Sequence, residues 1–94
     1  MSASGRAALV RIAGRVQGVG FRAWTQRNAI SLGLRGWVRN EPDGSVRALI
    51  AGSDEAVAAM LSALWQGPAG AGVTSVEPKP ADLSEAPADF DITG

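Results

Sequence analysis

The 94-residue sequence contains no cysteine, no histidine and no tyrosine, and its only lysine is Lys79. Without cysteine or histidine, the chain has no disulfide, no zinc finger, no Ser-His or Cys-His nucleophile and no phosphohistidine step. Carboxylates alone could bind magnesium or calcium, but no acidic segment has the ligand spacing of an EF-hand loop. Neither composition nor spacing therefore indicates a metal site.

Long apolar runs are also missing, so no segment is long enough to cross a bilayer. Residues 1–7 are small and polar and lack the apolar core of a signal peptide. A chain of this length forms one domain, because folding units commonly contain about 50 to 200 residues. We interpret residues 1–7 as a flexible N-terminal segment and residues 8–94 as the folded domain of a cytoplasmic monomer.

The sequence has no net charge, since nine basic residues balance nine acidic ones. The two signs are unevenly distributed. Residues 1–47 carry eight arginines against Glu41 and Asp43, a net charge of +6, and residues 48–94 carry Lys79 against seven acidic residues, a net charge of −6. Either the two halves pair their surface charges, or the first half binds an anion. The overall balance argues against nucleic acid or a membrane as a partner.

The first half of the sequence predicts a strand, a glycine-containing loop, a helix and a hairpin. Residues 9–14 have β-branched residues on one face, and residues 15–22 contain two glycines two positions apart. Residues from about 23 to 32 lack Gly and Pro and repeat apolar residues at helical spacing, with Gly33 as the stop signal. Strands over 36–40 and 45–51 flank a turn at 41–44 that ends in Asp43-Gly44.

The second half begins with a helix that Ser53 caps and that Gly67-Pro68 ends. A weak strand over 73–77, an Ala/Pro-rich connection over 78–87 and a short strand over 90–92 follow. The order β-α-β-β-α-β predicts a ferredoxin-like α+β sandwich: a four-stranded antiparallel sheet, to which residues 90–92 can add a fifth strand, with both helices on one face. This fold hosts many functions and decides none of them.

The loop over residues 15–22 has the parts of a phosphate cradle. Gly18 and Gly20 can turn successive N–H groups toward one point, and the loop leads into a helix N-terminus that favours an anion. Arg22 stands where the helix begins, and its guanidinium fork matches two phosphate oxygens. Such a loop can also be no more than a tight connection. It is not a nucleotide-binding P-loop, because the G-x-x-x-x-G-K-[ST] spacing is absent.

Two segments resemble the acylphosphatase signature, and the similarity extends from about Val10 to Ile92. The first segment is Gly14-Arg15-Val16-Gln17-Gly18-Val19-Gly20-Phe21-Arg22. The second is Leu32-Gly33-Leu34-x-Gly36-Trp37-Val38-Arg39-Asn40-x-x-Asp43-Gly44-x-Val46. Gly67-Pro68-x-x-Ala71-x-Val73 and Phe90-x-Ile92 resemble later landmarks of the family.

The resemblance implies a hydrolase that cleaves the carboxyl–phosphate bond of small acyl phosphates without metal or cofactor. It assigns phosphate binding to Arg22 and positioning of the attacking water to Asn40. The cradle would then consist of backbone N–H groups from five consecutive residues: Gln17, Gly18, Val19, Gly20 and Phe21. Asn40 has a second interpretation, because it precedes the turn at 41–44 and could simply cap the hairpin.

This chemistry suits the residues that are present. An acyl phosphate has a carboxylate leaving group, so the protein needs only to hold the phosphoryl oxygens, spread their charge and orient water in line. The neutral Asn40 side chain can accept a hydrogen bond from water without repelling phosphate, and a phosphoryl oxygen can take the proton. Because a shallow cradle contacts little of the acyl group, the sequence predicts broad specificity among acetyl, carbamoyl and larger acyl phosphates.

Three other interpretations of the sequence compete with a free-standing acylphosphatase. An anion-binding or regulatory ferredoxin-like module would have the fold without the reaction, but it would have no need for Arg22 and Asn40 together. The chain also resembles the N-terminal domain of hydrogenase-maturation carbamoyltransferases, longer proteins that use carbamoyl phosphate and continue into cysteine-bearing segments. An RNA-recognition domain would carry an aromatic-rich strand of the RNP1 pattern, which this sequence lacks.

Overall fold

The computed structural model describes residues 5–94. Its elements follow the predicted order of strand, helix, strand, strand, helix and strand, and then a 3-10 turn and a last short strand. Their bounds are β1 Gly5–Arg15, α1 Phe21–Ser31, β2 Arg35–Asn40, β3 Val46–Ser53, α2 Asp54–Gln66, β4 Gly72–Ala81, η1 Leu83–Glu85 and β5 Phe90–Ile92. None of the helices within these residues is long and apolar enough to cross a membrane.

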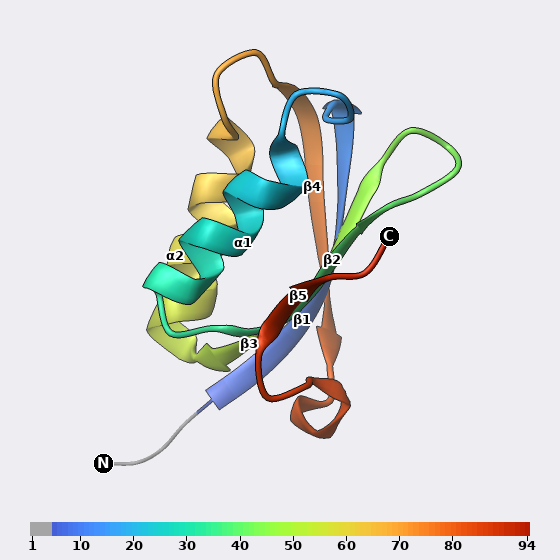
Figure 1. Ribbon diagram of the computed structural model, residues 1–94. Helices are drawn as coiled ribbons and strands as arrows, with labels where there is room; N and C mark the ends of the chain where they lie inside the picture. Colours follow the sequence, from blue (N-terminus) through green and yellow to red (C-terminus); the bar gives the residue numbers. More distant parts are fainter. Residues whose placement is uncertain (1–4) are drawn as a thin grey trace.

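The five strands form one sheet in the spatial order β4-β1-β3-β2-β5. Neighbouring strands from β4 to β2 are antiparallel, whereas β5 runs parallel to β2. Both helices cover the same face of the sheet (Figure 1). The other face is covered by no helix and carries a smaller apolar cluster in which Ala7, Leu49 and Ala51 are buried. The ferredoxin-like α+β sandwich is therefore confirmed. The fifth strand is present, and it makes the sheet mixed.

The hydrophobic core lies between the helices and the sheet. Alternate residues of the three central strands face the helices and are fully buried, as the two-residue period of a strand requires. They are Val10, Ile12, Val38, Val46, Ala48 and Ile50. The buried stripe of α2, Val57, Met60 and Leu64, packs against them. Each of these Val, Ile, Leu and Met side chains contributes about 1.5–3 kcal/mol on burial, so the core fixes the strand ends from which the loops emerge.

Two sequence boundaries need correction. β1 already begins at Gly5, where it pairs with Ser53, so residues 5–7 are part of the sheet; the remainder of the expected flexible segment, residues 1–4, lies outside the described residues. β4 continues through Pro78 and Pro80 to Ala81, where a connection was expected. The prolines are tolerated because β4 is an edge strand, where a missing N–H can face away from the sheet.

The β2–β3 hairpin has the predicted position, with Asn40 as the last residue of β2 opposite Val46. The N–H of Glu41 donates to the carbonyl oxygen of Ser45 at 2.9 Å, and the N–H of Gly44 donates to that of Glu41 at 3.1 Å. Gly44 has a φ of 92°, which favours glycine at this place in the turn. Ser45, expected in the strand, belongs to the turn. The hairpin thus presents Asn40 at its turn end, next to the loop that follows β1.

Candidate active site

The loop between β1 and α1 is shaped by its glycines. Gly18 and Gly20 have φ values of 76° and 78°, and a Cβ atom added at either position would meet no other atom within 4 Å. Glycine is therefore required there for the backbone angle and not for space. Buried Val16 and Phe21 hold the two ends of the loop in the core. The loop is a fixed, glycine-bent segment that leads directly into a helix.

The N-terminus of α1 carries neither a side-chain cap nor an acidic residue in its first turn. α2 differs, because Ser53 accepts a hydrogen bond from the N–H of Ala56 and two acidic residues, Asp54 and Glu55, occupy its first turn. Free N–H groups and the positive end of the helix dipole favour an anion. The first turn of α1 is therefore electrostatically prepared for a negative ligand.

Arg22 lies in that first turn, at the edge of the glycine loop. One of its terminal nitrogens donates to the main-chain oxygen of Gly94, which follows β5. This contact orients the guanidinium across the N-terminus of α1. Among residues 5–94 it is the only protein hydrogen bond that the Arg22 side chain makes, so the remaining donors of the fork are available to a ligand.

Asn40 approaches the same region from β2. Its side-chain oxygen Oδ1 is buried and accepts no hydrogen bond from any residue between 5 and 94. A buried acceptor without a partner costs about 1–3 kcal/mol, so this oxygen is a candidate to accept a hydrogen bond from water or from a ligand. The hairpin turn is closed by main-chain bonds and by Asp43, which accepts from Ser45, and the Asn40 side chain makes none of these hydrogen bonds. The contacts among residues 5–94 therefore give no support to the alternative role of Asn40 as a side-chain cap for this turn.

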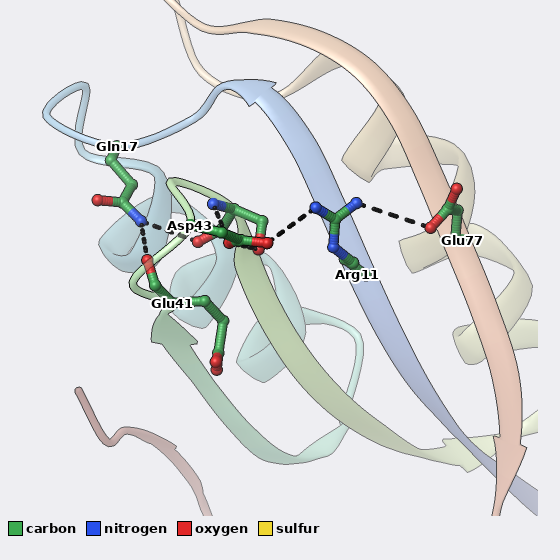
Figure 2. A network of polar contacts seen from close by, with 6 residues as sticks. Arg11, Gln17, Glu41, Asp43 and Glu77 are labelled. Atoms are coloured by element: carbon green, nitrogen blue, oxygen red, sulfur yellow. Dashed lines mark hydrogen bonds and ion pairs between the residues drawn. The ribbon is translucent and has the colours of Figure 1, made fainter.

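Gln17 connects the loop to the hairpin. Its side-chain nitrogen Nε2 donates to the carbonyl oxygens of Glu41 and Ser45, both at 2.9 Å. Figure 2 shows this amide between the loop and the turn. The sequence predicted a place for the Gln17 main chain in the cradle, but it gave no sign that the side chain would bind the turn that follows Asn40.

The hairpin turn is also held by a charged network on the face of the sheet opposite the helices (Figure 2). Asp43 accepts hydrogen bonds from the Ser45 hydroxyl at 2.6 Å and the Ser45 N–H at 2.9 Å, and it pairs with Arg11 at 3.0 Å. These contacts, the Ser45 bonds foremost, hold the pKa of the Asp43 carboxyl well below its usual range. Arg11 also approaches Glu77 of β4 at 3.8 Å.

A pocket of about 250 Å³ lies beside Arg22 and Asn40. Its lining comes from the loop, the first turn of α1, the end of β2 and β5: Val16, Gln17, Gly18, Gly20, Phe21, Arg22, Ala23, Asn40 and Ile92. Every residue predicted for the site is thus in one place except Val19, whose side chain packs against the core. The volume suits a small molecule, since sites for drug-sized ligands commonly exceed about 300 Å³.

Val16, Ala23 and Ile92 line the pocket although sequence reasoning did not assign them to the site. Val16 and Ala23 are chain neighbours of assigned residues, whereas Ile92 is distant in the sequence. Ile92 belongs to the segment Phe90-x-Ile92, which resembles a later landmark of the family. Its position at the pocket depends on the parallel pairing of β5 with β2, which sets Ile92 opposite Val38. Nothing in the local sequence signals that pairing. Within residues 5–94, no three Asp, Glu, His or Cys side chains gather where they could hold a metal ion.

Comparison with known proteins agrees with this geometry. The acylphosphatase family profile matches residues 8–92. An acylphosphatase of Rhizobium etli is 60% identical over 94 residues, which cover 100% of both chains. The solved structure of an acylphosphatase from Coxiella burnetii has a TM-score of 0.90 and 31% identity, covering 95% of this chain and 93% of that chain.

A structure of full-length HypF shares the fold, with a TM-score of 0.87 at 23% identity. The match covers 100% of this chain and 12% of that one. Sequence profile, full-length identity and fold all lead to one family, and the chain belongs to the acylphosphatases.

Proposed function

We propose that this protein hydrolyses the carboxyl–phosphate bond of acyl phosphates to a carboxylate and inorganic phosphate. The observation that carries the proposal is the meeting of Arg22 and Asn40 at one pocket, with the Asn40 oxygen buried and unpartnered among the described residues. A binding module needs the cationic group, but it has no use for a buried acceptor beside it. Hydrolysis needs both.

Phosphate binding is assigned to Arg22 and to the main chain of the loop. The guanidinium can bind two phosphoryl oxygens at once. The uncapped N-terminus of α1 supports this role, and so do the left-handed angles of Gly18 and Gly20, which turn the loop toward the pocket. As charge redistributes over the phosphoryl oxygens during reaction, these fixed donors stabilise it.

Water activation is assigned to Asn40. Its Oδ1 atom accepts a hydrogen bond from water and directs the water oxygen at phosphorus, in line with the leaving carboxylate. A bond forms between the water oxygen and phosphorus, and the bond between phosphorus and the acyl oxygen breaks with its electron pair on the carboxylate. A phosphoryl oxygen takes the proton. No protein group has to act as general base, which fits a pocket lined by no carboxylate and no histidine.

The enzyme is further proposed to act as a monomer in the cytoplasm on free small molecules. The short apolar runs and the overall charge balance support this part of the proposal. The alternative of a domain within a larger carbamoyl-phosphate-using protein has weaker support. Identity is 60% across an entire acylphosphatase and 23% to HypF, where likeness is limited to the fold.

The experiment that tests the proposal is phosphate release from benzoyl phosphate in the presence of a chelator. The wild-type protein is expected to turn over, and Arg22→Ala is expected to be inactive. Arg27→Ala is the matched control, because Arg27 is an exposed arginine of the same helix that does not line the pocket. Inorganic phosphate should compete with substrate.

An anion-binding module would bind phosphate without releasing it from any acyl phosphate, and that result would overturn the enzyme proposal. Turnover only after addition of a metal would overturn the mechanism but keep the activity. Noncompetitive inhibition by phosphate would place the anion site outside this pocket.

A further inference from the structure

Ile92 is a large apolar side chain that stays 40% exposed although it lies in a strand. It lines the pocket beside Arg22 and Asn40. The other large apolar residues of the lining, Val16 and Phe21, are 1% and 2% exposed and belong to the core. Accessible aliphatic surface at the pocket therefore comes chiefly from Ile92.

The position of Ile92 is set by the parallel pairing of β5 with β2. Ile92 lies opposite Val38, and the N–H of Thr93 donates to the Val38 carbonyl oxygen at 3.0 Å. Since side chains alternate along a strand, Ile92 shares the face of buried Phe90, and Asn40 shares the face of buried Val38. Both faces look toward the helices. Ile92 and Asn40 therefore stand on neighbouring strands and border the same pocket.

Gly18 and Gly20, which also line the pocket, have no side chain that could contact an acyl group. A Cβ atom added at either glycine would meet nothing within 4 Å apart from its neighbours in the chain. An acyl phosphate has two unlike ends, an anionic phosphoryl group and an acyl group joined through one oxygen. Once the loop and Arg22 bind the phosphoryl end, the acyl end extends out of the cradle. Ile92 is then the one large apolar side chain of the pocket lining that is accessible to it.

We propose that Ile92 forms the acyl-side wall of the pocket and makes the enzyme favour acyl phosphates with an apolar acyl group, aromatic or branched aliphatic, over acetyl or carbamoyl phosphate. This inference rests on the proposed hydrolase function and narrows the broad specificity that the shallow cradle alone predicts. The contact has a physical basis, because an apolar acyl group and the exposed part of Ile92 both leave water when they meet. A carbamoyl group, with its polar amide, gains nothing from such a wall.

The size of the effect follows from known discrimination in apolar pockets. One methylene in an enclosed pocket changes relative kcat/KM by about 10- to 200-fold. Ile92 is partly exposed to solvent, so we expect its truncation to change relative kcat/KM by an amount at the low end of that range. We expect the ratio of kcat/KM for benzoyl phosphate to that for acetyl phosphate to fall about 10-fold in Ile92→Ala.

The ratio of the two kcat/KM values is the right readout because the fraction of folded enzyme cancels in it. Ile92→Thr is the second variant, because it keeps the β-branched shape that suits a strand while it replaces apolar surface with a hydroxyl. Ile30→Ala is the matched control: Ile30 is 59% exposed on α1 and does not line the pocket. The ratio should fall in both Ile92 variants and stay at the wild-type value in the Ile30 variant.

A ratio unchanged within about twofold in both Ile92 variants would overturn the inference, since discrimination at an apolar wall cannot be that small. So would an equal loss with both substrates, because Ile92 would then support the cradle and not the acyl group. If the wild-type protein hydrolyses neither substrate, the proposed function itself is wrong. The two failures are thereby distinguished.

Discussion

The side-chain amide of Gln17 donates a 2.9 Å hydrogen bond to the carbonyl oxygen of Glu41, the residue that directly follows Asn40. A second bond from the same nitrogen reaches the carbonyl oxygen of Ser45 across the turn. The side-chain amide of Gln17 thus connects the phosphate loop to the turn of the β2–β3 hairpin, although the two segments are far apart in the sequence. The distance between the proposed phosphate cradle and the proposed water-positioning residue depends on this joint.

Replacing Gln17 with Ala is expected to lower kcat more than it weakens phosphate binding. Both carbonyls keep one main-chain donor, so the stability cost is about 1–2 kcal/mol. Alignment between loop and Asn40 is lost, and misalignment of this kind reduces turnover. Melting temperature, kcat and the inhibition constant of phosphate should be measured. Asn28→Ala, which removes the hydrogen bond from Asn28 to the Trp24 carbonyl within α1, controls for stability.

An equal fall of kcat in Gln17→Ala and Asn28→Ala would contradict a positioning role for Gln17. Both variants lose a partly buried side-chain bond to a carbonyl, so a merely structural contribution would affect them alike. The kcat values should be expressed per folded molecule, because simple loss of folded protein also lowers the apparent kcat and leaves the inhibition constant of phosphate unchanged.

Asp43 is expected to make stability depend on acid pH. Its folded-state pKa lies below the unfolded value of about 3.9, chiefly because the Ser45 hydroxyl and N–H donate to the ionised carboxylate. A lowered folded pKa gives stability that is present above the unfolded pKa and lost as the pH falls through the folded pKa. Asp43→Asn should therefore melt below wild type at pH 7, and the gap should begin to narrow below about pH 4 and continue to narrow as the pH falls further.

The comparison of the two proteins isolates Asp43 from the other carboxylates, which titrate in both. Arg11 contributes to the lowered pKa of Asp43 through an exposed ion pair, so added salt should narrow the gap at pH 7. A gap that stays constant from pH 7 to pH 2 would show that the Ser45 bonds do not depend on ionisation of Asp43.

Most of the fold could be predicted because its signals are local. Asp43-Gly44 between two alternating segments marks a hairpin, and Ser53 before an apolar stripe marks a capped helix; both are present. The extension of β4 through Pro78 and Pro80 could not be predicted, because only the edge position of the strand makes the prolines acceptable. Local sequence carries no information on which strand becomes an edge.

The same distinction between local signals and long-range contacts applies to the candidate site. The glycine loop and Arg22 are neighbours in the chain, so their meeting follows from the sequence alone. Asn40 is assigned to the site by resemblance, and its buried oxygen, which has no partner among residues 5–94, supports that proposal. Ile92 and the Gln17 side chain escaped prediction, because the first depends on a parallel pairing and the second on a contact between a loop and a distant turn.

Arg22→Lys is expected to lose most of the activity although it keeps the positive charge. An ammonium group cannot reproduce the planar fork that binds two phosphoryl oxygens, and its shorter reach changes the geometry at the N-terminus of α1. We expect kcat/KM to fall about 10²-fold in Arg22→Lys and further in Arg22→Ala. Steady-state kinetics with benzoyl phosphate measure both. A near-normal Arg22→Lys enzyme would mean that Arg22 acts only through its charge.

Asn40→Ala separates water positioning from phosphate binding. Asn40 is proposed to contact water and not the phosphoryl group, so kcat should fall about 10²-fold while the inhibition constant of phosphate stays near wild type. Stability should change little or rise, because the variant removes a buried acceptor that has no partner among the described residues. Melting temperature, phosphate inhibition and kcat on the same preparation give all three quantities.

Asn40→Asp sharpens the result, because aspartate has nearly the same shape but adds a negative charge beside the phosphate. It keeps an acceptor for water, so orientation alone would preserve turnover, whereas repulsion should weaken phosphate binding and raise KM. The pair of variants therefore predicts opposite patterns: Ala lowers kcat with phosphate binding intact, and Asp weakens phosphate binding. If Asn40→Ala instead bound phosphate weakly at an unchanged kcat, Asn40 would be a phosphate ligand and the water-positioning role would be refuted.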